Sequence, residues 1–376
     1  MNSADPPHHA PPAEAPATAL RRGWTTGACA AAAAKAAAAA LLTGSFPDPV
    51  AIRLPGGQEP AFALARHGLD DGAACAAIIK DAGDDPDVTH GALVWVRVTR
   101  GASGSGLTFS AGEGVGTVTL PGLPVPPGEP AINPHPRAMI EQAIRDVAPD
   151  VDFAVEIGVE NGRALALKTL NPRLGIVGGL SILGTTGIVI PFSCAAWIHS
   201  IHRGIDVARA TGHDHVAAST GSVSEQAVQR LHGLADRQLI EMGDFVGGTL
   251  KYLKAHPVAK VTLAGGPAKM TKLGQGMLDV HSRRGSADMG ALAAIAGDAG
   301  ASAGIRAAIE AANTVAEALG IAAGAGIALG DCVAVRAWAV AAPVLGESSD
   351  TMLEVVLFDR AGVLIGRAPF RAVRDA

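Results

Sequence analysis

The sequence has few aromatic residues, few charged residues and few cysteines. Of its 376 residues, 3% are aromatic and 17% are charged, whereas 48% are hydrophobic. A chain with so many hydrophobic and so few charged residues is not largely disordered, so the composition predicts a well-buried globular protein. Because single domains usually have ~100–200 residues, the length predicts two domains.

Positive charge is also scarce. The net charge is -5, and no run of Lys and Arg interleaved with aromatic residues is present. A nucleic-acid partner is therefore not expected, because binding to phosphate backbones depends on clustered positive charge.

The four cysteines, Cys29, Cys75, Cys194 and Cys332, lie far apart in the sequence. Without a CxxC pair or a Cys/His cluster, they indicate reduced thiols in a cytoplasmic protein. His213 and His215 share one face of a predicted strand, but no third ligand is evident. We therefore predict that the protein's side chains bind no metal.

Two apolar stretches could be mistaken for membrane or export segments. The first, residues 28–42, has Lys35 at its centre, which favours an ordinary helix with one solvated face. The second, residues 174–198, is long enough to cross a bilayer, but it is interrupted by Gly and Pro residues that include Gly178, Gly179, Gly184, Gly187 and Pro191. We expect no membrane span.

The chain is predicted to begin with a flexible Pro- and Ala-rich tail, residues 1–20, followed by an α+β domain, residues 21–194. Thr25 and Thr26 are expected to cap a helix that ends near Leu42. Short strands with a preference for antiparallel pairing are expected at 50–54, 61–65, 73–80 and 93–99. A helix at 136–147 and a hairpin of strands 153–160 and 163–168, turned at Asn161-Gly162, complete this domain.

From residue 195 to 376 the pattern changes to alternating helices and strands. Helices are expected to 210 and at 224–231 and 245–253, and strands at 215–218, 238–241 and 258–263. This alternation predicts an α/β Rossmann-like domain with a mainly parallel sheet, and a C-terminal hairpin of 353–358 and 363–368 is expected to cover a sheet edge.

Two helix starts in this domain follow predicted strands. They are residues 219–225, with a Ser222/Glu225 capping box, and Gly265-Gly266-Pro267. Either helix N-terminus is suited to an anion or to the carboxylate of a cofactor, although many such turns are plain connections.

One turn is unusually rich in carboxylates. Residues 80–91 contain Asp81, Asp84, Asp85, Asp87 and His90. Clustered carboxylates repel one another, so they indicate a bound cation or a general acid or base; the alternative is a solvated turn with local caps.

Three further segments contain more glycine and polar residues than folding requires. Residues 112–116 have three glycines at alternate positions, which let backbone approach a flat ligand. Residues 133–137 form a Pro-bracketed turn into a helix. Residues 160–187 place basic side chains before an uncharged glycine-rich loop, which suits a large ligand fringed with carboxylates; the alternative is a buried connection between domains.

In this order the segments resemble the CbiD family of cobalt-precorrin-5B C-1 methyltransferases. The matching strings are residues 23–30, 80–91, 112–122, 129–140 and 160–191, so the resemblance covers most of residues 22–191. A weaker match at 264–284 departs from the family pattern, because Gly265–Lys269 and Asp279–Ser282 lack a usual histidine and asparagine, whereas Lys269, His281 and Ser282 are kept.

The resemblance implies methyl transfer from S-adenosylmethionine to C-1 of a corrinoid in cobalamin biosynthesis, with other enzymes of that pathway as candidate partners. The residues expected to be catalytic are Asp81, Asp84, Asp85 and His90. Those expected to bind the corrinoid are Thr25, Thr26, Asn133, Arg163, Lys168, Asn171, Arg173, Lys269, His281 and Ser282. Those expected to bind the donor are Glu113, Gly114, Gly116, Gly178, Gly179, Thr185 and Thr186.

Two other functions fit part of the pattern. A non-catalytic carrier or scaffold for corrinoid intermediates would share the basic residues and glycine loops but would not bind S-adenosylmethionine. A nucleotide-dependent ligase is disfavoured because the sequence has no GxxxxGK[ST] motif.

Overall fold

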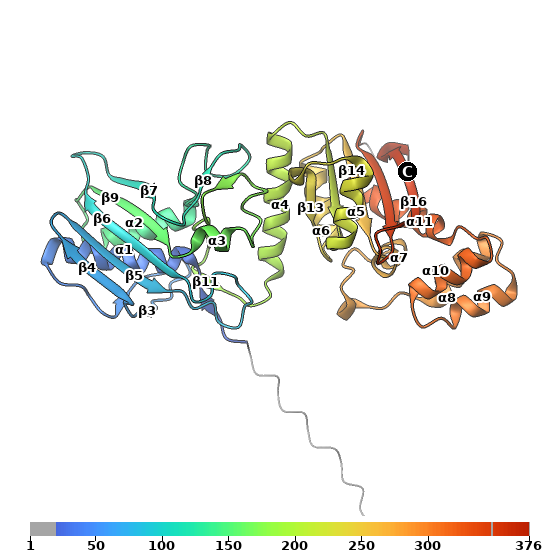
Figure 1. Ribbon diagram of the computed structural model, residues 1–376, viewed down its shortest axis with the longest axis horizontal. Coiled ribbons are helices and arrows are strands. Elements are labelled where there is room, and N and C mark those ends of the chain that lie inside the picture. Colours follow the sequence, from blue (N-terminus) through green and yellow to red (C-terminus); the bar gives the residue numbers. More distant parts are fainter. Residues whose placement is uncertain (1–19, 347–348, 376) are drawn as a thin grey trace, which may run out of the picture.

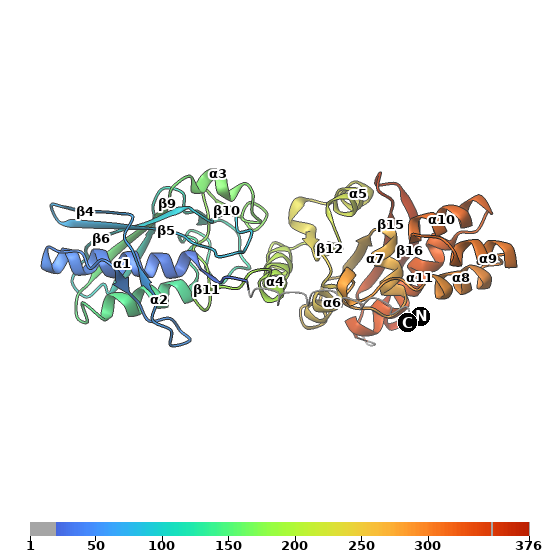
Figure 2. The same ribbon diagram turned by 90° about the horizontal axis from the view of Figure 1, so that it is seen from below.

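The structure, a computed structural model, describes residues 20–346 and 349–375, so most of the predicted N-terminal tail lies outside it. Figures 1 and 2 show two bodies along the long axis, with helix α4 (Cys194–Ala210) between them. Each has its own large hydrophobic core, one built from residues 28–182 and the other from residues 201–373.

The first body is built on a five-stranded sheet in the order β4-β5-β6-β9-β7. Its strands are Arg66–Asp70, Ala73–Ile79, Leu93–Arg100, Phe153–Val159 and Leu107–Ala111, in that spatial order. Pairing is antiparallel, as expected, except between β7 and β9, which run parallel. Strands β4 and β7 were not predicted.

Three two-stranded sheets surround this one, and they pair β1 with β11, β2 with β3, and β8 with β10. Their strands are Gly23–Trp24, Ile188–Val189, Val50–Ala51, Ala61–Phe62, Thr117–Val118 and Ile176–Val177. The uncharged stretch 174–198 therefore forms short strands, loops and the start of α4, rather than a continuous helix.

The alanine-rich helix α1 (Thr26–Thr43) packs on this sheet together with α2 (Pro134–Arg145). The Thr25 side chain accepts a hydrogen bond from the Ala28 backbone N–H at 3.1 Å, which confirms the expected cap. Lys35 lies 3.1 Å from Asp146 at the end of α2. By length and composition α1 could cross a membrane, but 72% of it is buried, as in the core helix of a globular domain.

The predicted hairpin at Asn161-Gly162 is wrong in its second half. Asn161 has the positive φ of 58° that such a turn requires, but the chain then enters a short helix, α3 (Gly162–Ala166). Both edges of β9 are already paired, with β6 and with β7, so a strand at 163–168 would have no free edge to join. Local alternation could not reveal that β7 occupies the edge.

The second body has a five-stranded sheet in the order β13-β12-β14-β15-β16. The strands are Leu239–Glu241, His215–Ser219, Lys260–Gly265, Met352–Phe358 and Leu364–Ala372, in that spatial order. The first four are parallel, and β16 forms an antiparallel edge, which confirms the C-terminal hairpin. The chain as a whole is a mixed α/β protein with both parallel and antiparallel pairing.

Helices connect these strands and cover the sheet. They are α5 (Ser222–His232), α6 (Val246–Ala255), α7 (Pro267–Gly274), α8 (Met289–Asp298), α9 (Ala303–Glu310), α10 (Val315–Gly324) and α11 (Leu329–Leu345). The predicted Ser222/Glu225 capping box is absent, because Gly221 is the N-cap of α5 and Glu225 binds Arg173 instead.

Candidate functional site

A cleft of about 890 Å³ lies where strands β12, β14 and β15 end. Strand β12 lies between β13 and β14. The chain therefore runs from β12 to β13 on one side and then returns past β12 to β14 on the other side. In open α/β sheets such a switch point at the carboxyl edge is the usual place for a ligand. The cleft is thus the best-placed candidate site among the described residues.

Two helix N-termini form the polar end of the cleft. Helix α5 begins after Gly221 and α7 after Gly266, and neither has a side chain that caps its first turn. Their first backbone N–H groups therefore remain available to an anionic group of a ligand. Gly265 allows close packing here, because a Cβ would lie 2.6 Å from the terminal methyl group of Met270 and 2.9 Å from Thr220 Oγ1, and these side chains would have to shift.

Lys269 links the strand ends at this edge. Its Nζ donates to the Thr220 carbonyl oxygen at 2.8 Å and lies 3.0 Å from the Asp244 carboxylate. Thr220 follows β12 and Asp244 follows β13, so one ammonium group holds two neighbouring loops beside the cleft. Lys269, expected to bind the corrinoid, thus has two partners within the protein.

Much of the remaining lining of the cleft is apolar, and this apolar wall comes mainly from α10, α11 and the hairpin. Its larger apolar side chains are Val315, Leu319, Ile327, Leu329, Phe358 and Ile365. Gly330 lets α11 approach β16, because a Cβ there would collide with the Ile365 carbonyl oxygen. One end with free N–H groups and one apolar wall together suit a ligand with an anionic head and a flat apolar part.

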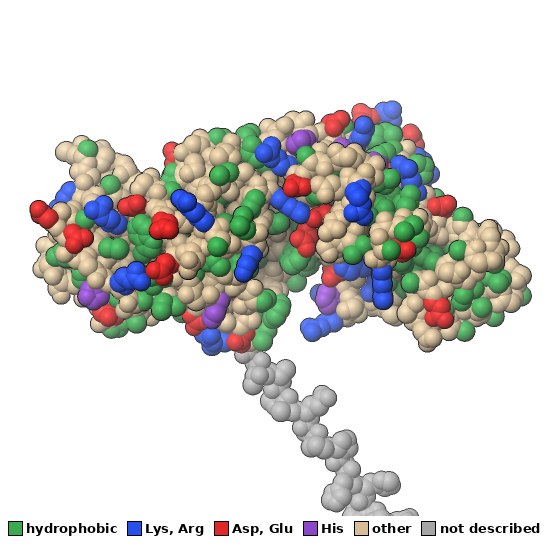
Figure 3. All heavy atoms as spheres, viewed as in Figure 1, with side chains coloured by type: hydrophobic (Ala, Val, Ile, Leu, Met, Phe, Trp, Pro, Cys, Tyr) green, Lys and Arg blue, Asp and Glu red, His purple; other side chains and the backbone are tan. Residues whose placement is uncertain are grey.

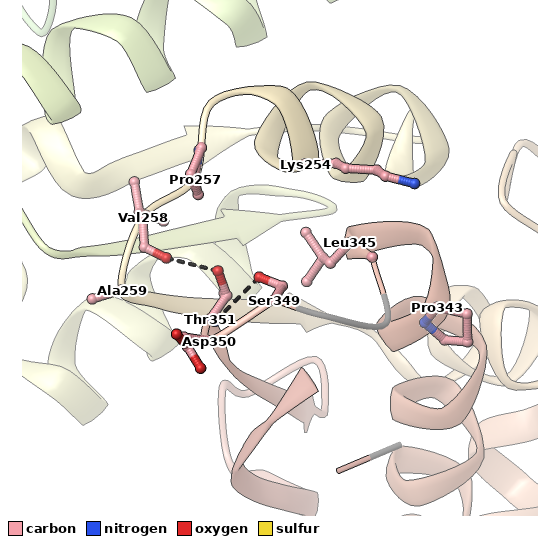
Figure 4. A pocket seen from close by; sticks show the side chains of 10 residues that line it. Lys254, Pro257, Val258, Ala259, Pro343, Leu345, Ser349, Asp350 and Thr351 are labelled. Carbon is pink, nitrogen blue, oxygen red and sulfur yellow. Dashed lines mark hydrogen bonds between the residues drawn. The ribbon is translucent and has the colours of Figure 1, made fainter. Parts of the chain in front are cut away.

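A second cavity, of about 910 Å³, is slightly larger but less well placed (Figure 4). It lies at the opposite edge, beside the amino ends of β14 and β15. The Thr351 hydroxyl donates to the Val258 carbonyl oxygen at 3.0 Å, and the Thr351 backbone N–H donates to Ser349 Oγ at 3.2 Å. With these polar groups already paired, position and chemistry both favour the cleft at the carboxyl edge.

The acidic turn lies in the first body, where its carboxylates bind other parts of the chain. Asp81 forms an ion pair with Arg21, and the Asp84 carboxylate accepts the Arg21 backbone N–H at 2.6 Å. Asp85 accepts the Phe192 backbone N–H at 2.9 Å.

The remaining carboxylate of the turn, Asp87, lies 2.6 Å from the buried ammonium of Lys80. His90, more than half exposed, accepts the Ala82 N–H at 3.1 Å through Nδ1. All four carboxylates thus have partners within the protein.

These contacts also set the protonation state of Asp81. The hydrogen bond from Arg21, helped by the Gly83 N–H, lowers the pKa of Asp81 to about 2. Asp81 is therefore ionised at neutral pH and does not fit the protonated general acid considered from sequence. A direct role of Asp81, Asp84, Asp85 and His90 in methyl transfer stays a prediction.

Three of the four glycines expected at the donor site pack closely against other parts of the chain. A Cβ on Gly114 would collide with the Val159 carbonyl oxygen, and one on Gly179 would collide with Gly114. A Cβ on Gly116 would lie 2.5 Å from Ile176. The space that these glycines leave is filled by the protein itself, which removes the reason for placing a flat ligand there.

The other residues expected at the donor site lie on the surface. Glu113, Gly178, Thr185 and Thr186 are exposed, and Thr186 Oγ1 accepts the Ile188 backbone N–H at 3.2 Å. The structure brings none of the predicted donor residues to the cleft at the carboxyl edge.

Three of the cations expected to bind the corrinoid, Arg163, Lys168 and Arg173, differ in their surroundings. Arg163 and Lys168 are exposed on and after α3, and neither forms an ion pair with a described residue. Arg173 instead binds Glu225 of α5 with two hydrogen bonds of 3.0 and 2.6 Å. This contact joins the two bodies beside the first turn of α5.

The uncharged residues of the predicted corrinoid site have mainly structural contacts. Thr25 and Thr26 are buried, and Thr26 Oγ1 accepts the Leu183 N–H at 3.0 Å. Asn171 is buried and donates to the Gly179 carbonyl oxygen at 3.4 Å. Asn133 is the N-cap of α2 but makes no capping hydrogen bond with its side chain.

His281 and Ser282 lie on an exposed segment after α7. His281 Nδ1 accepts the Arg283 backbone N–H at 3.0 Å, and the buried Lys272 donates to the Val280 carbonyl oxygen at 3.3 Å. Lys272 thereby fixes this segment to α7, while His281 and Ser282 remain accessible to a substrate.

Sequence reasoning missed the apolar wall and the residues after β15, Asp359 and Arg360, which also line the cleft. The strand 353–358 was predicted, so the position of these two residues at its carboxyl end was an available signal. Across residues 20–346 and 349–375, no group of three or more His, Cys, Asp or Glu side chains is arranged to hold a metal ion.

The fold and this cleft place the chain among mixed α/β proteins in which a parallel sheet opens at its carboxyl edge into a ligand-sized cleft. The family model described as CbiD matches residues 13–191, and the one described as CbiD, C-terminal domain, matches residues 279–369. The chain belongs to the CbiD family.

Two curated relatives are named cobalt-precorrin-5B C(1)-methyltransferase. The chain is 61% identical to the protein of Agrobacterium fabrum over 94% of both chains. It is 60% identical to that of Halorhodospira halophila over 95% of this chain and 97% of the relative. The chain also resembles the cobalamin biosynthesis protein cbiD from Archaeoglobus fulgidus, which has a crystal structure. The two are 26% identical, the match covers 70% of this chain and 83% of the cbiD chain, and the TM-score is 0.38.

Proposed function

We propose that this protein transfers the methyl group of S-adenosylmethionine to C-1 of cobalt-precorrin-5B, giving cobalt-precorrin-6A in cobalamin biosynthesis. The observation that carries the proposal is the 61% identity, over nearly all of both chains, to a relative named for that reaction. As a biosynthetic enzyme of this kind, it is expected to act in the cytoplasm.

The proposal includes a division of labour between two domains. We take residues 21–194 as an α+β domain and residues 195–376 as a Rossmann-like domain, and we place the methyl donor in the cleft at the carboxyl edge of the parallel sheet. The cleft supports this placement better than the glycine segments do, because backbone already fills the space beside Gly114 and Gly179.

The residues of the cleft match the two ends of the donor. The uncapped N-termini of α5 and α7 offer N–H groups to its carboxylate, and the helix dipoles favour negative charge at that point. The wall formed by Leu319, Ile327 and Phe358 suits the flat base of its adenosyl part. Lys269 holds the two loops beside β12 and β13 in place, so we assign it a positioning role.

When bound, the donor would supply an electrophilic methyl group: the bond from methyl to the sulfonium sulfur breaks as the bond to C-1 forms, and S-adenosylhomocysteine leaves with the electron pair on sulfur. This displacement needs no nucleophile on the protein, and alignment of the two reactants can contribute ~7–11 kcal/mol. The residues that line the cleft would contribute by holding the donor in one orientation toward the acceptor. His281 and Ser282, exposed after α7, remain candidates for contact with the corrinoid.

A direct assay tests the proposed function. The purified protein, incubated with S-adenosylmethionine labelled in its methyl group and with cobalt-precorrin-5B, is expected to give a corrinoid that carries one label at C-1. Calorimetric titration with S-adenosylmethionine alone should show binding. A protein that binds corrinoid but neither binds the donor nor transfers label would be a carrier, and the proposal would fail.

A further inference from the structure

Phe192 combines two features that folding does not explain. Its backbone has a φ of 56°, in the left-handed region that favours glycine, and its side chain is 68% exposed. A bulky side chain costs free energy in that conformation. An exposed ring recovers none of this cost through burial, so glycine would serve the fold at least as well here.

The conformation of Phe192 is imposed by the acidic turn. The Asp85 carboxylate accepts the Phe192 N–H at 2.9 Å. The turn is itself fixed to the N-terminal strand, because the Trp24 N–H donates to the Asp81 carbonyl oxygen at 2.7 Å and the Asp84 N–H donates to the Arg21 carbonyl oxygen at 2.9 Å. One hydrogen bond therefore holds the strained residue Phe192 to a turn that two further hydrogen bonds fix to the N-terminal strand.

The surroundings of Phe192 combine apolar surface with one available cation. The antiparallel pairing of β1 with β11 ends at Gly23 and Val189, so Arg22 and Ile190 are the next residues beyond that end of the pair. Ile190 is 53% exposed, and Arg22 is exposed and forms no ion pair with any residue in the described part of the chain. By contrast, the neighbouring Arg21 is bound to Asp81.

Ile190 and Phe192 belong to the segment that joins β11 to α4, the helix between the two bodies (Figure 1), and Arg22 directly precedes β1, the partner of β11. Figure 3 shows that the surface is hollowed between the bodies below α4, with hydrophobic side chains along the wall of the first body. The hollow is therefore bordered by apolar surface on the side where β11 leads into α4.

We propose that Phe192 is the platform on which the corrinoid acceptor stacks, with Arg22 binding one of the acceptor's carboxylates. The proposal rests on the proposed function for the identity of the acceptor. A corrinoid has a broad ring face and a fringe of carboxylates, and Phe192 and Arg22 offer the complement of both: an exposed aromatic ring for the face and an unpaired guanidinium for the fringe. Asp85 then acts as a positioning residue, since it holds the Phe192 backbone and does not touch the acceptor.

The test uses substitutions that separate strain from stacking. Phe192→Gly removes the ring and relieves the strained φ, so the thermal midpoint should stay unchanged or rise. Equilibrium dialysis with cobyrinic acid, a stable cobalt corrinoid with free carboxylates, should nevertheless show a Kd raised about tenfold, with the Kd for S-adenosylmethionine unchanged. Phe192→Tyr, which keeps a ring, should bind as tightly as wild type.

Two further variants sharpen the result. Arg22→Gln should weaken the binding of cobyrinic acid and reduce its dependence on salt. Leu167→Ala, at an apolar residue that is 78% exposed elsewhere on the first body, is the matched control and should change neither affinity.

The inference is overturned if wild type does not bind cobyrinic acid, or if Phe192→Gly binds it as tightly as wild type. If wild type also transfers methyl groups in either case, the proposed function stands and only the platform is lost. If corrinoid binding depends on Phe192 but no methyl transfer occurs, the platform stands and the proposed function fails.

Discussion

Replacing Asp87 with asparagine should destabilise the first body strongly. The Lys80 side chain is 1% exposed, and its ammonium lies 2.6 Å from the Asp87 carboxylate. Burial alone would raise the pKa of Asp87, but the ion pair with Lys80 and the hydrogen bonds from Thr89 outweigh it, and the pKa is lowered. Asp87→Asn removes the negative charge and leaves a buried ammonium without a counter-charge.

Breaking a buried ion pair from one side typically costs about 3–5 kcal/mol. The Asp87 side chain is 24% exposed, so water reaches its side of the pair and the lower end, about 3 kcal/mol, is expected. With a shift of roughly 2–4 °C per kcal/mol, the thermal midpoint should fall by roughly 6–12 °C.

Differential scanning calorimetry and urea unfolding measure this change. Asp71→Asn, at an exposed carboxylate in the turn at the other end of β5, is the control and should leave the midpoint unchanged. The double variant Lys80→Met/Asp87→Asn should recover most of the lost stability, because no charge is then buried alone. A free energy of unfolding for Asp87→Asn within about 1 kcal/mol of wild type would refute this reasoning.

Three further outcomes are expected. Asp81→Asn should lower turnover only to the extent that it lowers the thermal midpoint of the protein. If turnover is lost while the midpoint is unchanged, Asp81 has the catalytic role predicted from sequence. Arg173→Ala loses two partly buried hydrogen bonds to Glu225, so the free energy of unfolding measured in urea should fall by about 1.5 kcal/mol. The affinity for the corrinoid should be unchanged. Weaker corrinoid binding at unchanged stability would instead place Arg173 in the substrate site. Burial, together with the nearby His232, lowers the pKa of His215 to about 4, so its neutral form stabilises the fold above pH 6.5. That stability, at most about 3 kcal/mol, should be lost as the pH falls from 6.5 to 4. In His215→Gln, the free energy of unfolding should depend less on pH over this range. If the pH dependence is the same as in wild type, His215 is not its source.

Local signals predicted much of the fold. The Thr25 cap and the alanine run located α1, and alternating helices and strands predicted the parallel sheet from β12 to β14. The strand expected at 163–168 became α3 because β7 occupies the edge it would have joined. That pairing joins segments far apart in the sequence, so no local pattern reveals it.

The candidate site was less predictable for the same physical reason. Three of the four carboxylates in the acidic turn are bound by Arg21 or by the Phe192 backbone, which are 60 or more residues away in the sequence. The apolar wall of the cleft comes from Ala-rich helices whose residues look like ordinary core. The glycine turns at the starts of α5 and α7, together with Lys269, were recognisable, because helix starts after parallel strands have a defined position at the sheet edge.

Donor binding to a pair of matched variants tests the central claim most directly. Ala323 and Ala325 are both exposed near the end of α10, but only Ala323 lines the cleft. Tryptophan at position 323 should fill the apolar part of the cleft, whereas tryptophan at position 325 should not. Calorimetric titration should show that Ala323→Trp loses S-adenosylmethionine binding at least tenfold, while Ala325→Trp binds as wild type and both keep the wild-type thermal midpoint. Wild-type donor affinity in Ala323→Trp would contradict the placement of the methyl donor in this cleft.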